Sequence, residues 1–169
     1  MIPHCLFVDG GLVGKNPSKL GGTWCYCWVD TKDQLMHHRC GLILPEEMGV
    51  EAVTNNQTEL LAAIYALDSV ADGWHGDLFT DSKVTLYRIM RGIPEGKPGV
   101  PEWLRQELMK LRSLKRWRAI LVGGHPTRRE LERGYRIKNN LPVHQFNQFC
   151  DSECQRLARN FLANGKSVG

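Results

Sequence analysis

The chain has 169 residues, 42% of them hydrophobic, and a formal net charge of +4 at pH 7. This length suffices for one domain, 1–169, with a core that needs no disulfide or metal staples. No run approaches the roughly 18 apolar residues that span a membrane, and the first residues lack the features of a signal peptide, so we expect a cytoplasmic protein.

The first half of the chain reads as three strands followed by a helix. Apolar, aromatic and β-branched residues predict strands at 5–8, 23–29 and 34–44, which in series favour an antiparallel meander. A helical stripe that starts at Leu60 predicts a helix behind the capping residues 54–56. Glu59 is expected in its first turn, where a carboxylate that only complements the helix dipole is one interpretation.

The second half alternates helices and short strands. The pattern predicts a strand at 78–80, helices at 81–91 and 102–114, a strand at 118–122 and a helix at 145–162 that stops at Asn164-Gly165. A polar, basic insertion occupies about 126–143. The order indicates a mixed α/β fold, a five-stranded mixed sheet with helices on both faces, in which the strands at 5–8, 78–80 and 118–122 are parallel and central.

Six cysteines fall inside these predicted elements. Cys25 and Cys27 share one face of a strand, and Cys150 and Cys154 share one face of a helix. In a reducing compartment we expect them to be small buried hydrophobes. The spacing typical of a zinc site is absent.

Acidic residues follow two of the predicted parallel strands. Asp9 and Asp81 each end an apolar run, and ligands collect at the carboxyl edge of such sheets. If Glu59 and Asp151 point there from flanking helices, four carboxylates converge and need cations to relieve their repulsion. Oxygen ligands favour Mg²⁺ or Mn²⁺, and a pair of such ions is typical of phosphoryl transfer.

The basic residues of the chain are unevenly distributed. Residues 101–140 contain eleven Lys and Arg against four acidic residues. A solvated surface is one interpretation of this excess, and a polyanionic partner such as nucleic acid is the other.

Six motifs occur in an order that resembles the successive motifs of type 1 ribonucleases H. They are Val8-Asp9-Gly10-Gly11, Asn16-Pro17, 54–60 (TNNQTEL), Phe79-Thr80-Asp81-Ser82, Gly124-His125 and 150–159 (CDSECQRLAR). The resemblance covers nearly the whole chain and implies the ribonuclease H fold. It also implies an endoribonuclease that hydrolyses the RNA strand of RNA–DNA hybrids and leaves 5′-phosphate and 3′-hydroxyl ends.

By this resemblance, two Mg²⁺ ions, with Mn²⁺ as the alternative, are bound by Asp9, Glu59, Asp81 and Asp151. His125 matches the family's catalytic histidine at the end of the last strand. The insertion makes its distance from Asp151 longer than in the family, so His144, seven residues before Asp151, is the competing candidate. The resemblance indicates an RNA–DNA hybrid as partner, with no membrane and no obligate protein partner.

The family's contacts to the hybrid map onto four amide side chains, Asn16, Asn55, Asn56 and Gln57. Neutral amides suit 2′-hydroxyls, which both donate and accept hydrogen bonds. Turn and cap formation is their other interpretation. Some family members carry a basic helical handle between residues corresponding to 91 and 103, where this chain has a short Gly/Pro loop. We expect basic residues of the insertion to take its place: Arg128, Arg129, Arg133, Arg136 and Lys138.

Two other functions compete with this one. A DNA-cutting relative on the same fold, such as a junction resolvase, would share the carboxylates, but it has no 2′-hydroxyl for the amides to read. A non-catalytic hybrid-binding module would not need all four carboxylates.

Overall fold

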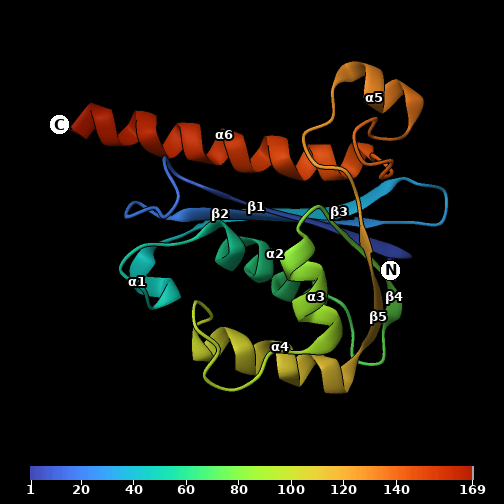
Figure 1. Cartoon of the computed structure of the whole chain (residues 1–169), viewed down its shortest axis with the longest axis horizontal. Helices are drawn as coiled ribbons and strands as arrows, with labels where there is room; N and C mark the ends of the chain where they lie inside the picture. The colour runs from blue at the N-terminus through green and yellow to red at the C-terminus, as the bar shows by residue number, and fades with distance from the viewer. Residues whose placement is uncertain (169) are drawn as a thin grey trace.

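A five-stranded mixed sheet runs through the molecule in the order β3-β2-β1-β4-β5 (Figure 1). In this computed structural model, which describes residues 1–168, the strands are β1 (Cys5–Leu12), β2 (Gly22–Val29), β3 (Leu35–Ile43), β4 (His75–Thr80) and β5 (Arg116–Leu121). β1, β2 and β3 pair antiparallel, whereas β4 pairs parallel with both β1 and β5. The expected mixed α/β class and the three parallel strands are confirmed. The prediction that all three are central is wrong for β5, which lies at an edge of the sheet.

Helices cover both faces of this sheet, as the sequence predicted (Figure 1). α2 (Asn55–Ser69), α3 (Lys83–Arg91) and α4 (Glu102–Leu114) lie on one face, and α6 (Gln145–Val168) crosses the other. Two short helices were not predicted, α1 (Pro45–Met48) and α5 (Arg128–Arg133). The predicted stop at Asn164-Gly165 is wrong, because α6 continues through both residues. Within 1–168, no helix is both long enough and apolar enough to cross a membrane.

The sheet separates two hydrophobic layers of unequal size. Alternate residues of a strand face opposite sides, so Leu6 and Val8 pack with the helices of one face while Phe7 packs beneath α6. The larger layer contains the inward stripes of α2 and α4, among them Leu60, Leu67 and Leu104. The smaller layer includes Phe7 and five cysteines: Cys5, Cys25, Cys27, Cys150 and Cys154. The expectation of buried cysteines is therefore confirmed for these five, whereas Cys40 is half-buried.

β1 is longer than the sequence predicted. Asp9 does not end the strand, because pairing with β2 continues through Gly10 and Gly11 to Leu12. The glycines instead permit a close approach. A Cβ on Gly10 would lie 2.4 Å from the carbonyl carbon of Thr58 and 2.5 Å from the nitrogen of Glu59. Gly10 thus allows the start of α2 to rest directly on β1.

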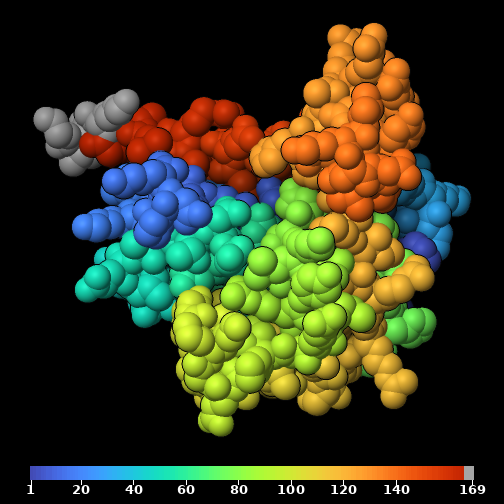
Figure 2. All heavy atoms as spheres, viewed as in Figure 1, coloured from blue at the N-terminus to red at the C-terminus, as the bar shows by residue number. Residues whose placement is uncertain are grey.

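The basic insertion is folded and stands out from the body of the molecule. It forms the orange lobe beside the start of α6 in Figure 2. Thr127 caps α5, and the carboxylate of Glu130 accepts hydrogen bonds from the backbone nitrogens of Thr127 (3.1 Å) and Ile137 (2.8 Å). A bridge between Tyr135 and Pro142 closes the segment. These contacts give the lobe a defined shape without a core of its own.

Candidate metal centre

Three carboxylates from different elements meet beside the carboxyl end of β4. Asp9 comes from β1, Glu59 from α2, and Asp81 from the residue directly after β4. Each offers an oxygen that lies within 4.8 Å of the others. Asp9 is 3% exposed and Glu59 is 4% exposed, so this is a buried cluster rather than an acidic surface patch.

Glu59 reaches the cluster because α2 begins where it does. Thr54 caps the helix by accepting a hydrogen bond from the nitrogen of Gln57, and the Gln57 side chain accepts one from the nitrogen of Thr54. Glu59 consequently lies beyond the first turn, contrary to expectation, and its Oε2 accepts a hydrogen bond of 3.2 Å from the nitrogen of Gly10. Its carboxylate faces Asp9, so the interpretation as a charge that only complements the helix dipole is wrong.

The electrostatics of the cluster favour neutralisation by a cation. Burial, followed by the charge of Glu59, raises the pKa of Asp9 well above its ordinary value. Burial, followed by the charge of Asp81, does the same to the pKa of Glu59. Burial also raises the pKa of Asp81. Without a counter-charge, these carboxyl groups favour their protonated, neutral form. Hard divalent cations are the ions that clusters of oxygen ligands of this kind bind.

Asp151 lies at the rim of the cluster. Its charge contributes to the raised pKa of Asp9, Glu59 and Asp81. Its side chain is 19% exposed, and its Oδ2 lies 3.4 Å from Nδ1 of His125 and 3.0 Å from Nε2 of Gln155. The fourth predicted carboxylate is therefore close to the other three and more open to solvent than Asp9 and Glu59.

The two candidate histidines lie in different places. His125 has 73% of its side chain exposed next to Asp151, and its backbone φ is +50°. His144 is packed under α6, with its ring centroid 4.5 Å from that of Phe7 and its Nε2 3.4 Å from Asp33. Of the two, His125 is the one beside the acidic cluster.

One polar residue at the cluster was not predicted from the sequence. Asn147 is 1% exposed, and its Nδ2 donates to Oδ2 of Asp81 at 3.4 Å. Its Oδ1 is buried with no partner among the described residues. Spacing was the signal that could have found it, since Asn147 precedes Asp151 by one helical turn and therefore shares a face of α6 with it.

Comparison with known proteins identifies the architecture. No sequence model of a known family matches the chain, and no curated protein matches it. Solved structures do match. The N-terminal ribonuclease H domain of a Mycobacterium tuberculosis protein aligns over 95% of this chain and 98% of its own, with a TM-score of 0.62 and 15% identity. The chain has the ribonuclease H fold.

Two further structures agree with this result. A ribonuclease H1 isolated from compost, LC11, matches over 96% of this chain and 99% of its own (TM-score 0.56, 18% identity). Ribonuclease H1 of Halobacterium salinarum matches over 71% and 85% (TM-score 0.54, 21% identity). The expected ribonuclease H fold is thereby confirmed.

On this ribonuclease H fold, three of the four predicted amides lie at or near the surface. Asn56 and Asn16 are exposed and Asn55 is half-buried, with Oδ1 of Asn16 accepting a hydrogen bond of 3.3 Å from the nitrogen of Asn55. Gln57 differs. Its side chain is buried, caps α2 and donates to the carbonyl oxygen of Gly99 at 3.1 Å. The geometry gives Gln57 the role of holding the loop before α4 against the start of α2.

The basic residues of the insertion are divided between surface and support. Arg128 and Arg129 are exposed, with Arg128 3.5 Å from Glu132. Arg133 and Lys138 are also exposed. Arg136 is half-buried, and a Cβ on Gly123 would lie only 3.0 Å from the Cβ of Arg136. Arg136 therefore helps to seat the lobe on the strand end.

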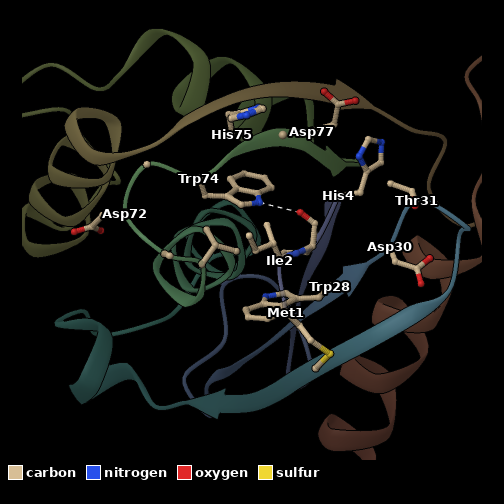
Figure 3. Close-up of a pocket in the computed structure, with 15 residues that line it drawn as sticks. Met1, Ile2, His4, Trp28, Asp30, Thr31, Asp72, Trp74, His75 and Asp77 are labelled. Atoms are coloured by element: carbon tan, nitrogen blue, oxygen red, sulfur yellow. Dashed lines mark hydrogen bonds between the residues drawn. The ribbon is translucent and has the colours of Figure 1, made fainter.

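A cavity of about 650 Å³ lies away from the carboxylates (Figure 3). It opens at the amino-terminal ends of β1 and β4, between the rings of Trp28 and Trp74 and the first residues of the chain. The indole nitrogen of Trp74 donates to the carbonyl oxygen of Pro3, which closes one wall. Because the cavity shares no residue with the acidic cluster, it is not part of the candidate metal centre.

Proposed function

We propose that this protein is a ribonuclease H that hydrolyses the RNA strand of RNA–DNA hybrids and leaves 5′-phosphate and 3′-hydroxyl ends. The observation that carries the proposal is the group of buried Asp9, buried Glu59 and half-buried Asp81, with oxygens within 4.8 Å of one another at the carboxyl edge of a ribonuclease H sheet. The structures with this fold that resemble the chain are ribonucleases H by name, which supports the same substrate.

The residues present fit divalent cations. Asp9, Glu59 and Asp81 would hold them, with half-buried Asp151 as the fourth ligand, and Mg²⁺ or Mn²⁺ suits an all-oxygen set. A pair of bound ions would supply an attacking water of lowered pKa and charge stabilisation for the departing oxygen. The nitrogen of Gly10 and the amide of Asn147 fix the carboxylates of Glu59 and Asp81. Such outer contacts typically change metal affinity by about 10–100-fold.

His125 is proposed to move a proton. Its Nδ1 faces Asp151, and most of its side chain is exposed, so its Nε2 is able to exchange a proton with the leaving 3′-oxygen. His144 has no such access, because its ring is packed against Phe7.

Substrate recognition is proposed for two surfaces. Asn16, Asn55 and Asn56 lie together at the start of α2, where neutral amides would meet 2′-hydroxyls in the minor groove. Arg128 and Arg129 of the insertion would contact phosphates, which position a nucleic acid without reading its sequence. Gln57 acts here through the loop it holds rather than by contact with the hybrid.

The test offers three labelled substrates, an RNA–DNA hybrid, duplex DNA and duplex RNA, each with Mg²⁺ or Mn²⁺. We expect cutting of the RNA strand of the hybrid alone, with 5′-phosphate ends. The Asp81→Asn variant should show a rate about 10²–10³-fold lower, since a single electrostatic group at the reacting centre contributes that much. Asp77→Asn, four residues earlier on β4 and paired with Arg118, is the matched control and should retain the rate.

Two outcomes would contradict the proposal. Cutting of duplex DNA would favour a resolvase-like nuclease on the same fold. Binding of the hybrid without cutting, under every metal condition, would favour a non-catalytic binding module.

A further inference from the structure

Four thiols gather beneath α6, on the face of the sheet away from α2. Cys25 and Cys27 project from β2, Cys40 lies on β3 directly across from Cys25, and Cys150 projects from α6. The Sγ atoms of Cys27 and Cys150 are 3.4 Å apart, and both residues are fully buried. The thiol of Cys25 interacts with those of the other three. The sequence predicted buried cysteines but not this convergence.

The thiols are not spaced as a ready metal site. Tetrahedral zinc with sulfur ligands about 2.3 Å away requires several sulfurs roughly 3.8 Å from one another. Within 1–168, the group of three or more potential ligands that meets a 4.8 Å limit is Asp9, Glu59 and Asp81, and no set of thiols does. The reaction to consider for these cysteines is therefore one between two thiols.

We propose that Cys27 and Cys150 form a reversible disulfide on exposure to a small hydroperoxide, and that this bond ties α6 to β2. The Cys27 thiolate attacks one peroxide oxygen and the O–O bond breaks, so that Cys27 becomes a sulfenic acid. The other oxygen takes up a proton from water and leaves as water or an alcohol. The Cys150 thiol then displaces the sulfenic oxygen as water, and the S–S bond forms. One peroxide is reduced by two electrons, and two thiols are oxidised.

The contact between the two sulfurs and the lowered pKa of the Cys27 thiol distinguish this pair from the other thiols. The hydrogen bonds that Cys27 receives from Cys150 and Cys25 lower the pKa of the Cys27 thiol to about 5. The Sγ atom of Cys150 lies within hydrogen-bond distance of that of Cys27, which makes Cys150 the partner thiol for Cys27. The thiolate is the nucleophile in this chemistry. The sulfurs must close from 3.4 Å to about 2.05 Å for the bond to form.

Cys40 is the competing thiol, because it is the one cysteine of the six that is only half-buried. Exposure alone would make it react first. Burial, followed by the charge of Cys25, raises the pKa of Cys40 to about 12, and its Sγ lies 3.9 Å from the Glu153 carboxylate. It therefore remains protonated and unreactive. Hydrogen peroxide is close to water in size, so local opening beneath α6 is enough to admit it to the buried pair.

The experiment treats the full chain with hydrogen peroxide and blocks the remaining thiols in denaturant. Peptides are then mapped without reduction. We expect two of the six thiols to be consumed, a peptide containing Cys27 to be linked to one containing Cys150, and full recovery with a reducing agent. The oxidised protein should melt about 5–10 °C higher, since a bond closing so long a loop stabilises the folded chain.

Matched variants keep the test sharp. Cys150→Ala should abolish the linked peptide, whereas Cys154→Ala, one turn along the same buried face of α6, should retain it. If Cys150→Ala fails to fold, the peptide map of the unsubstituted chain decides. Oxidation of Cys40 first, a Cys25–Cys40 linkage or six unreacted thiols would each overturn the proposal. None of these readouts depends on nuclease activity.

Discussion

Asp9 on β1 lies level with Asp81, the residue directly after the neighbouring parallel strand β4. β1 and β4 pair from Cys5 opposite Asp77 to Phe7 opposite Phe79, and two further residues in the same register bring Asp9 opposite Asp81. β4 stops at Thr80, whereas β1 continues alongside β2. Adjacent strands are about 4.8 Å apart, so the register itself forces the two carboxylates together. Glu59 enters the same space from α2.

Removing one of these charges should stabilise the metal-free protein. Burial raises the pKa of Asp81 and its charge raises that of Glu59, so the ionised cluster opposes folding. In the presence of a chelator, we expect Asp81→Asn to raise the free energy of unfolding by about 1–3 kcal/mol. The melting temperature should rise by about 2–4 °C for each kcal/mol. Divalent ions should then stabilise the variant less than the unsubstituted protein. If Asp81→Asn melted at a lower temperature than the unsubstituted protein in the chelator, repulsion within the cluster would not be opposing folding.

Gly10 should not tolerate a side chain. A Cβ there would meet the backbone of Thr58 and Glu59 at 2.4–2.5 Å, which forces α2 away from β1. Gly10→Ala should cost about 1–3 kcal/mol of stability and weaken divalent-ion binding measured by calorimetry, because Glu59 is displaced. Gly165→Ala has nothing within 4 Å of the new Cβ and should be neutral or slightly stabilising in its helix. Equal behaviour of the two variants would refute the close-approach argument.

Replacing His125 should affect the cleavage rate, whereas replacing His144 should affect the stability of the protein. His125→Ala should lower the rate at saturating hybrid by roughly 10²-fold and leave the melting temperature unchanged, since its side chain is 73% exposed. His144→Ala should keep the rate and reduce stability by about 1–3 kcal/mol, because its ring packs on Phe7. Steady-state kinetics beside thermal melts measure both. A decrease in rate confined to His144→Ala would reverse the assignment.

The exposed cations of the insertion should set part of the salt dependence of binding. The variant replaces four of them with Gln: Arg128, Arg129, Arg133 and Lys138. Arg136 is left in place because it supports the lobe. The slope of log K against log salt concentration should become shallower by about 0.7–0.9 for each phosphate that the variant no longer neutralises. A control with Lys32→Gln and Lys110→Gln, both exposed and outside the insertion, should keep the original slope. An unchanged slope in the fourfold variant would remove the insertion from the interface.

The lobe should open in acid. Backbone hydrogen bonds from Thr127 and Ile137 lower the pKa of Glu130 below its ordinary value of 4.5. A carboxyl group whose pKa is lower when folded stabilises fully above its unfolded pKa, and that stability disappears as pH falls through the folded pKa. Amide hydrogen exchange in 127–143 should therefore accelerate below about pH 4.5 after correction for intrinsic rates. Glu130→Gln should show fast exchange at every pH. If exchange in 127–143 of the unsubstituted protein did not change with acid, the Glu130 carboxylate would not be what holds the lobe.

Patterns within a few residues predicted most elements. The strand alternation and helical stripes were enough for the sheet and the principal helices, and α4 has the predicted bounds, 102–114. The length of β1 was missed because Gly10 and Gly11 look like a turn, whereas here they allow α2 and β2 to pack closely. The continuation of α6 past Asn164-Gly165 likewise overrides a local stop signal.

The site depends on contacts between residues far apart in the sequence, and only some of these contacts could be predicted. Asp9 and Asp81 could be brought together by the rule for parallel strands. Asn147 was missed, although it precedes Asp151 by one helical turn, because the docking of α6 on the sheet is what brings its amide to Asp81. Gln57 was predicted to contact substrate, yet its amide is engaged by Thr54 and Gly99. The thiol pair likewise joins residues 123 positions apart.

The most direct measurement is a crystal structure of the unsubstituted protein and of its Asp81→Asn variant, each soaked in Mn²⁺ with a hybrid bound and recorded with anomalous scattering. The account predicts two anomalous peaks in the unsubstituted protein, contacted by Asp9, Glu59 and Asp81, with Asp151 on one of them, and weakened peaks in Asp81→Asn. A structure in which these carboxylates hold no ion, or in which Mn²⁺ binds only elsewhere, would contradict it.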